Sequence, residues 1–203
     1  MTLPLWPDPT DPEDVLPFDG SARLRREFLD VRSADRILRD LLTEIPWTTH
    51  DIVLFGRKMT EPRFSAWIAD ANVSYRYSGI ERRPEPWTPT LSSLRDTCEA
   101  KLETKFNSVL ANHYRDGDDS MGWHADDEPE LGPEPVIASM SFGAERRFDF
   151  KHRTTGETRS VVLPHGSLLV MSGATQRNWV HRIARSKKVA AGRINLTFRF
   201  VHA

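Results

Sequence analysis

The chain has 203 residues, a formal net charge of −1 and a single cysteine. This length suits one domain with a sizeable hydrophobic core. One cysteine excludes an internal disulfide framework, and no apolar run reaches the length of a membrane-spanning helix. The N-terminus is acidic and rich in proline, unlike a signal peptide. The composition therefore predicts a soluble, intracellular protein, cytoplasmic in a bacterium or nuclear in a eukaryote.

The charges are unevenly distributed along the chain. Residues 1–20 contain five acidic residues, five prolines and no lysine or arginine. This predicts a disordered or loosely docked leader in front of a single domain over residues 21–203. From Arg146 to Arg199, by contrast, twelve lysines and arginines are accompanied by only two acidic residues. A basic half is usually solvated surface, but it is also what binding to a phosphate backbone requires.

Two helices are predicted in the first half of the chain. After a strand-like Leu24–Val31, Ser33 is expected to cap a helix that ends at Pro46. A second helix is expected after Thr88, with Pro89 in its first turn. Each helix carries one apolar stripe that should face the core, formed by Ile37, Leu38, Leu41, Leu42 and Ile45 in the first and by Leu91, Leu94, Cys98 and Leu102 in the second.

From Phe106 onward the pattern changes to short strands separated by turns rich in Gly, Pro, Asp and Ser. Such strands after two helices predict an α+β fold. Its expected core is a double-stranded β-helix (jelly roll) with two or more flanking helices. The predicted strands are Ser108–Arg115, Val136–Gly143, Arg146–Lys151, Arg159–Leu163, Ser167–Met171, Trp179–Ile183 and Arg193–Val201.

A His and an Asp separated by one residue follow a Gly/Asp-rich turn. Residues i and i+2 of an extended chain point the same way, so His124 and Asp126 can offer a nitrogen and an oxygen to one metal ion. His181 is the best candidate for a third ligand. Two His and one carboxylate form the facial triad of non-haem Fe(II) oxygenases, which leaves coordination positions open. A lone H-x-D is more often a surface polar pair, so this interpretation needs support from elsewhere.

The last predicted strand carries an unusual polar row. Its apolar residues alternate with Arg193, Asn195, Thr197 and Arg199. An ordinary strand with its polar face in water is one interpretation. However, two arginines with no acid between them repel each other unless an anion lies near. Long arginine side chains can reach one short dicarboxylate, and the planar guanidinium suits a carboxylate.

The strand at Ser108–Arg115 offers further polar groups. Asn112 and Tyr114 share one of its faces. An amide and a phenol there could complete the pocket that the two arginines suggest. The residues then agree on a metal triad with open positions beside a site for a two-carboxylate acid.

Together these motifs resemble the AlkB family of Fe(II)- and 2-oxoglutarate-dependent nucleic-acid demethylases. Within that family the similarity is greatest to the human nuclear AlkB-type repair enzymes, through Pro62-Arg63, Ser78-Gly79, Ile137–Ala144 and His165–Leu169. The resemblance extends from about Phe55 to Phe200. Each motif alone is weak, but the ordered set is specific. It comprises Asn112-x-Tyr114, His124-x-Asp126-Asp127-Glu128, His181 and Arg193-x-Asn195-Leu196-Thr197-Phe198-Arg199.

The resemblance implies roles for these residues. His124, Asp126 and His181 would bind iron. 2-Oxoglutarate would be held by Asn112, Tyr114, Arg193 and Arg199, with Asn195 and Thr197 lining the same wall. Arg193 is expected at the distal carboxylate and Arg199 at the carboxylate near the metal. The implied reaction consumes 2-oxoglutarate and O2, forms succinate, and removes an N-methyl group from a damaged base as formaldehyde.

The implied substrate is alkylated DNA, single- or double-stranded, with RNA as a further candidate and no membrane or obligate protein partner. The base must be flipped out or unpaired, and aromatic surfaces must stack on it. Tyr75 and Tyr77 would share one strand face for this, although core packing is the common role of such a pair. Asp127 and Glu128 suit a cationic base such as 1-methyladenine or 3-methylcytosine, but could equally form a solvated turn.

Phe55 falls where a duplex-specific relative has an aromatic finger that fills the gap left by a flipped base. The apolar run 52–55 can equally be a buried strand. The segment Pro62–Trp67 is more similar to the relative that prefers single strands. The sequence therefore leaves the strand preference open.

Two alternative functions also remain open. An Fe(II)/2-oxoglutarate hydroxylase of a protein, lipid or small molecule would share the triad and the arginines. A non-catalytic nucleic-acid-binding module on the same fold is the second alternative. It is disfavoured because no metal or co-substrate position is missing.

Overall fold

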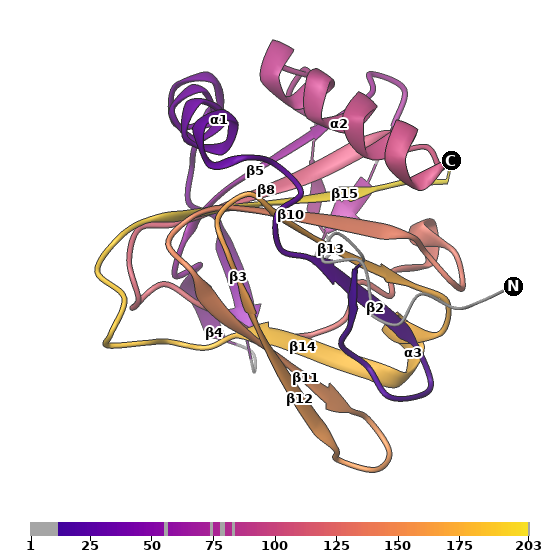
Figure 1. Cartoon of the computed structure of the whole chain (residues 1–203). Helices are drawn as coiled ribbons and strands as arrows, with labels where there is room; N and C mark the ends of the chain where they lie inside the picture. The colour runs from indigo at the N-terminus through magenta and orange to yellow at the C-terminus, as the bar shows by residue number, and fades with distance from the viewer. Residues whose placement is uncertain (1–11, 55–56, 74, 78–79, 83, 203) are drawn as a thin grey trace, which may run out of the picture.

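The computed structural model describes residues 12–54, 57–73, 75–77, 80–82 and 84–202, with the backbone alone for those of 51–59 and 75–82. Two antiparallel sheets form most of the structure, and two long helices lie together on one side of the larger sheet (Figure 1). No helix in these ranges is long and apolar enough to cross a membrane.

The larger sheet has seven strands, most of them from the second half of the chain. Its order is β1-β2-β13-β10-β15-β8-β5, and every neighbouring pair is antiparallel. The strands are β1 (Glu13–Asp14), β2 (Ser21–Arg25), β13 (Ser167–Ser172), β10 (Ile137–Gly143), β15 (Arg193–Arg199), β8 (Ser108–Tyr114) and β5 (Phe64–Ala69).

The smaller sheet has four strands in the order β12-β11-β14-β9. It faces the larger sheet, and its β11–β12 hairpin extends beyond the rest of the molecule (Figure 1). The strands are β9 (Met121–His124), β11 (Arg146–His152), β12 (Thr158–Leu163) and β14 (Trp179–Ile183). Two small hairpins accompany the sheets, β3 (Asp51–Leu54) with β4 (Arg57–Thr60) and β6 (Tyr75–Tyr77) with β7 (Ile80–Arg82).

Helices α1 (Val31–Glu44) and α2 (Pro89–Leu102) cover the outer face of the larger sheet. Their apolar stripes pack on the sheet and form the main hydrophobic core, although Leu42 of the predicted first stripe is 43% exposed and lies outside it. The predicted stripe of the second helix is confirmed, because Leu91, Leu94 and Cys98 are all buried. Burial raises the pKa of the Cys98 thiol to about 12, as expected of a core cysteine.

A second core fills the space between the two sheets. It contains residues of both, such as Tyr114 and Ile137 from the larger sheet and Phe148 and Phe150 from the smaller one. All seven residues of β15 are buried, so its polar row faces this interior. The interpretation of β15 as a strand with one face in water is therefore wrong.

The predicted elements after residue 106 agree with the structure to within two residues at each end. β9 was not predicted as a strand, because four residues with a glycine give little periodicity. The predicted strand Leu24–Val31 is largely wrong, since β2 ends at Arg25 and α1 begins at Val31. Asp30 caps that helix instead of Ser33, with its carboxylate accepting a hydrogen bond from the Ser33 amide at 3.0 Å.

The second half of the predicted leader, residues 12–20, packs against the sheets. Strand β1 pairs with β2, and Leu16 is buried in the core between the sheets. The backbone oxygen of Phe18 accepts a hydrogen bond from the Trp179 indole at 3.1 Å. This part of the chain is therefore more firmly docked than its composition predicted.

Candidate active site

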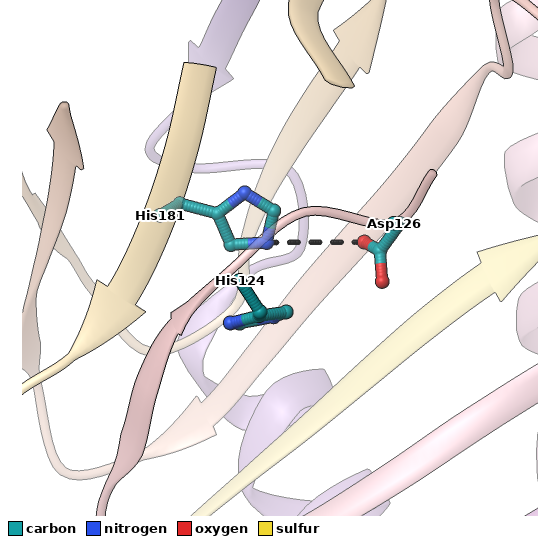
Figure 2. Close-up of side chains that lie close together, drawn as sticks. All are labelled: His124, Asp126 and His181. Carbon is teal, nitrogen blue, oxygen red and sulfur yellow. Dashed lines mark ion pairs between the residues drawn. The ribbon is translucent and has the colours of Figure 1, made fainter. Parts of the chain in front are cut away.

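Three potential metal ligands converge in the interior between the sheets (Figure 2). His124 ends β9, Asp126 follows in the next loop, and His181 lies in the middle of β14. Their ligand atoms all lie within 4.8 Å of one another. The strand register explains this convergence, because His124 and His181 are direct partners in the β9–β14 pair. The two imidazole centroids are 4.2 Å apart.

Electrostatics prepare these groups for a cation. Burial and the neighbouring His124 lower the pKa of His181 to about 3. Burial also lowers the pKa of His124, so both imidazoles are neutral at pH 7. Burial disfavours the charged form of Asp126, but Arg199 and the two imidazoles outweigh it, and the pKa of Asp126 is lowered. Two neutral imidazoles and one carboxylate are the donor set that suits Fe(II).

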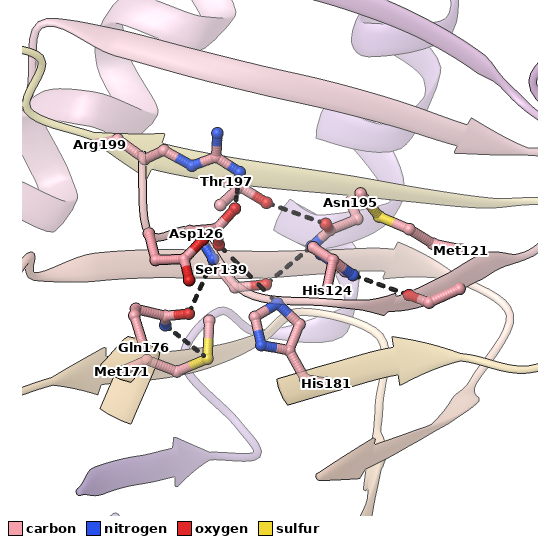
Figure 3. A network of polar contacts seen from close by, with 12 residues as sticks. Met121, His124, Asp126, Ser139, Met171, Gln176, His181, Asn195, Thr197 and Arg199 are labelled. Carbon is pink, nitrogen blue, oxygen red and sulfur yellow. Dashed lines mark hydrogen bonds and ion pairs between the residues drawn. The ribbon is translucent and has the colours of Figure 1, made fainter. Parts of the chain in front are cut away.

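Two of the three potential ligands, His124 and Asp126, are held by a second contact (Figure 3). His124 Nδ1 lies 2.8 Å from the Gly122 carbonyl oxygen, which favours the tautomer with a free Nε2. The Asp126 amide donates to Gln176 Oε1 at 3.0 Å, and the Asp126 Oδ1 accepts from Arg199 Nη2 at 2.5 Å. Because Arg199 occupies Oδ1, Asp126 presents Oδ2, which lies 3.8 Å from His181 Nε2.

One cavity brings together all nine residues that were predicted for metal and 2-oxoglutarate. Its walls come from both sheets, with the imidazoles on the smaller sheet and the polar row on the larger one. The lining residues are Leu110, Asn112, Tyr114, Met121, His124, Asp126, Ser139, Phe148, Met171, His181, Ile183, Arg193, Asn195, Thr197 and Arg199.

Arg193 is an incompletely satisfied cation in this cavity. It is only 1% exposed, and its Nη2 donates a hydrogen bond to Ser141 Oγ at 2.9 Å. Its Nε and Nη1 are buried and find no hydrogen-bond acceptor among the described residues. Burial lowers the pKa of Arg193 to about 10, which still leaves it charged at pH 7. A buried charge with unpaired donors is costly unless an anion binds there.

Asn195 and Thr197 are already occupied by hydrogen bonds within the protein. The Asn195 amide donates to Ser139 Oγ at 2.8 Å and to the Met140 carbonyl at 2.9 Å. Its Oδ1 accepts from the Thr197 hydroxyl at 3.1 Å. These contacts brace β15 against β10, so Asn195 shapes the cavity wall with few groups left for a ligand.

Asn112 is oriented by a buried ion pair that the sequence did not reveal. Arg63 Nε donates to Asn112 Oδ1 at 2.7 Å, and Arg63 Nη2 lies 2.5 Å from Glu61 Oε2. Both charged side chains are almost fully buried. Since Oδ1 of Asn112 is taken by a donor, its NH2 group is the one that can donate to a ligand.

The predicted substrate residues are only partly described. Asp127 follows Asp126 directly and pairs with Arg153 at 2.6 Å, so its carboxylate is not free. Glu128 carries an Oε2 that is buried without a hydrogen-bond partner. Phe55 lies outside the described residues, and so do the side chains of Tyr75 and Tyr77, although both tyrosines belong to strand β6.

The sequence interpretation missed several residues of the cavity and its surroundings. Leu110, Met121, Met171 and Ile183 line it with apolar surface, and Phe148 stacks on His181 with centroids 5.1 Å apart. Strand alternation could have identified these residues, since each lies two or three positions from a predicted site residue or on a facing strand.

Known proteins are similar to most of this chain. The model of the 2OG-Fe(II) oxygenase superfamily matches residues 21–199. The human alpha-ketoglutarate-dependent dioxygenase alkB homolog 3 is 40% identical over 185 residues, which cover 86% of this chain and 64% of that protein. The mouse DNA oxidative demethylase ALKBH2 is 43% identical over 178 residues, which cover 82% of this chain and 74% of that protein.

The chain belongs to the AlkB family of 2OG-Fe(II) oxygenases. Membership gives the cofactors as Fe(II) with 2-oxoglutarate and O2, and the triad of the AlkB-type cavity fits that metal. The solved structure of OsALKBH1 superposes with a TM-score of 0.65 at 19% identity, covering 92% of this chain and 99% of that one, which establishes a shared AlkB fold. The chain spans about 64% of the length of the human alkB homolog 3.

Proposed function

We propose that this protein is a dioxygenase that oxidatively demethylates N-alkylated bases in DNA, such as 1-methyladenine and 3-methylcytosine, and releases formaldehyde and succinate. The observation that carries the proposal is a buried, incompletely paired Arg193 in the same cavity as a His-Asp-His triad. Fe(II) bound with 2-oxoglutarate and O2 supplies the oxidising chemistry in this superfamily.

The metal would be held by His124, Asp126 and His181. Both imidazoles are neutral at pH 7, so no proton has to leave before they bind a cation. Asp126 contributes the negative charge, and its contact with Arg199 fixes which oxygen faces the metal. Three protein ligands leave coordination positions for the co-substrate.

The two arginines would hold opposite ends of 2-oxoglutarate. Arg199 touches Asp126 and so belongs to the metal end of the cavity. Arg193 stands six residues away along β15, where it can bind the distal carboxylate. The NH2 of Asn112 and the phenol of Tyr114 add donors on the facing part of β8. Asn195 and Thr197 support this wall through the hydrogen bonds that brace β15.

We also propose that the two sheets form a double-stranded β-helix core. Strands β8 to β15 supply four strands to each sheet, and the chain alternates between the sheets except at the β11–β12 hairpin. All of these pairs are antiparallel, as a jelly roll requires. Residues 21–203 would then act as one catalytic domain.

Nucleic acid as the substrate class rests on the names of the relatives and on charge. The basic excess between Arg146 and Arg199 suits a phosphate backbone. Asp127 and Glu128 follow Asp126 directly in the sequence, and the Glu128 Oε2, which has no hydrogen-bond partner among the described residues, is the carboxylate oxygen left to attract a cationic base, because Asp127 pairs with Arg153. Tyr75, Tyr77 and Phe55 remain the proposed base-stacking and wedge residues. DNA is the proposed partner, and RNA is a further candidate.

The test is mass spectrometry of 1-methyladenine and 3-methylcytosine oligonucleotides, single- and double-stranded and as DNA and RNA, after incubation with Fe(II), ascorbate and 2-oxoglutarate. We expect a loss of 14 mass units per lesion together with equimolar succinate and formaldehyde. Methylated peptides form the comparison arm. Turnover of peptides alone would show a different hydroxylase, and binding of oligonucleotides without any succinate would show a non-catalytic module.

A further inference from the structure

Arg146, the first residue of β11, is a further buried cation beside the cavity. It is 2% exposed, and within the described part of the chain its guanidinium donates to backbone carbonyls alone. Nη1 donates to Asp116 O at 2.9 Å, and Nη2 donates to Asp119 O at 2.9 Å and to Ala184 O at 2.7 Å. Among the described residues, no carboxylate lies within ion-pair distance of Arg146.

The three carbonyls belong to two loops that meet at one end of the cavity. Two of them lie in the turn between β8 and β9, and the third begins the loop between β14 and β15. The loops also bind each other, because the Gly117 amide donates to Val189 O and the Ser186 amide donates to Gly117 O, both at 2.8 Å. A side chain on Gly117 would collide with the second loop, since its Cβ would lie 1.9 Å from Ser186 O.

These loops flank the strands that carry the proposed co-substrate groups. Tyr114 stands just before the first loop, and Arg193 stands just after the second. The Tyr114 ring lies near two guanidinium groups, with the Arg146 Cζ at 5.6 Å and the Arg193 Cζ at 5.3 Å from its centroid. The Tyr114 hydroxyl points toward the cavity residue Met121, 3.9 Å from its sulfur. The ring therefore transmits the position of Arg146 to the 2-oxoglutarate end of the cavity.

We infer that Arg146 is a positioning residue for 2-oxoglutarate, which fixes Tyr114 and Arg193 by tying together the two loops next to them. This inference rests on the proposed function, because it assumes that these two residues bind the co-substrate. It assigns a role in co-substrate affinity to a residue that does not touch the co-substrate. Of the proposed metal ligands, His124 lies at the end of β9 that is farther from these loops, and His181 lies in the middle of β14. Metal binding should therefore depend less on Arg146.

A lysine cannot replace this arginine. Lysine keeps the charge, but its single ammonium nitrogen cannot reach the three carbonyls that the planar guanidinium reaches from two nitrogens. Arg146→Lys therefore keeps the charge and removes the geometry. Arg147→Lys is the matched control, because Arg147 is the next residue of β11 and its side chain is 69% exposed on the outer face.

The experiment is calorimetric titration of 2-oxoglutarate into protein loaded with Mn²⁺, which binds in place of Fe(II) without turnover. We expect Arg146→Lys to raise the dissociation constant of 2-oxoglutarate roughly tenfold, while Mn²⁺ affinity stays within about twofold of wild type. The Fe(II) enzyme should show a raised KM for 2-oxoglutarate with kcat nearly retained. Arg147→Lys should match wild type. An unchanged dissociation constant in Arg146→Lys, or a lowered kcat at unchanged KM, would overturn the inference.

A measurement on the wild-type protein covers the case in which Arg146→Lys does not fold. If the tied loops favour 2-oxoglutarate binding, then 2-oxoglutarate must stabilise the tied loops by linkage. Hydrogen exchange at the amides of Gly117 and Ser186 should therefore slow when 2-oxoglutarate is added to the Mn²⁺ protein. If exchange at these amides is unchanged at saturating 2-oxoglutarate, the role inferred for Arg146 is wrong, but the proposed function is not affected. Wild-type protein that binds no 2-oxoglutarate contradicts the proposed function, and the inference with it.

Discussion

The two sheets contribute opposite kinds of chemistry to the cavity. The smaller sheet supplies imidazoles that burial keeps neutral, so the side chains of the metal half carry little uncompensated charge. The larger sheet supplies Arg193, a buried cation with two nitrogens that lack an acceptor. The ion pair between Asp126 and Arg199 joins the two halves. The charge of Asp126 in the metal half is therefore paired within the protein, whereas the charge of Arg193 is paired only when an anion binds.

The largest expected effect is the loss of turnover when a proposed metal ligand is replaced, and the stability of the variants should distinguish Asp126 from His124. Replacing a residue that hydrogen-bonds to a metal ligand typically lowers activity roughly 10- to 100-fold. His124→Ala and Asp126→Ala remove a ligand itself, so each should reduce turnover by more than that. Only Asp126→Ala should also destabilise the protein strongly, by about 3–5 kcal/mol, because it breaks the buried ion pair with Arg199. Succinate release and urea unfolding at pH 7 measure the two effects. Equal free energies of unfolding of the two variants would show that the Asp126–Arg199 ion pair does not stabilise the contact between the two sheets.

Replacing Arg193 tests the other half of the comparison. Arg193→Met should raise the 2-oxoglutarate requirement roughly ten- to a hundredfold, since a charge-assisted contact contributes on the order of 1.5–3 kcal/mol. Without 2-oxoglutarate the variant should be as stable as wild type or more stable, because an unsatisfied buried charge has been removed. Melting curves with and without 2-oxoglutarate check both points. A large loss of stability in the absence of co-substrate would contradict an unsatisfied Arg193.

The sequence alone predicted the strands and the cavity residues well where alternation was strong. In β15 every second residue is polar, and the polar row identified the face that lines the cavity. The pairing of β9 with β14 was less predictable. His124 and His181 are 57 positions apart in the sequence, and only the sheet register places them opposite each other. The sequence offered His181 as the best candidate for the third ligand, and the resemblance to the AlkB family assigned it to the iron, but neither predicted the strand pairing.

Hydrogen-bond partners were beyond what the sequence could predict. Alternation places Asn195 on the cavity face, but it does not show that Ser139 and Thr197 already occupy its amide. Likewise, Arg63 and Asn112 are 49 positions apart, and their contact depends on the pairing of β5 with β8. Distant partners of this kind decide which polar groups remain available to a ligand.

A smaller effect distinguishes the two asparagines of the polar walls. Asn112→Ala should raise the KM for 2-oxoglutarate by a few fold, since one hydrogen bond contributes about 1 kcal/mol. Asn195→Ala should instead lower the free energy of unfolding by about 1–3 kcal/mol, because it leaves buried partners on Ser139 and Thr197 unpaired. The KM and the urea midpoint of each variant decide the matter. The reverse pattern would show that Asn195 binds the ligand and Asn112 braces the fold.

The smallest expected effect concerns the outer face of the smaller sheet, where a carboxylate is satisfied without any ligand. Asp149 is 4% exposed and accepts from Ser160 at 2.7 Å, from Arg147 at 2.6 Å and from Arg182 at 3.0 Å. Burial opposes ionisation of Asp149, but these three contacts outweigh it and lower its pKa below the usual value. A carboxyl with a lowered folded-state pKa stabilises the protein above its unfolded pKa of about 3.9 and loses that contribution as the pH falls through the folded value.

Asp149→Asn should therefore lower the free energy of unfolding at pH 7 by on the order of 1 kcal/mol, a modest amount because its arginine partners are largely exposed. The difference in unfolding free energy between the variant and wild type should shrink as the pH falls below about 3.9. In this range the Asp149 carboxyl of the unfolded chain takes up a proton, so ionisation no longer favours the folded state as strongly. Urea unfolding at pH 7 and pH 3 provides the measurement. The 2-oxoglutarate KM should not change, since Asp149 faces away from the cavity. A difference in stability that is the same at both pH values would show that the contribution of Asp149 does not come from its charge.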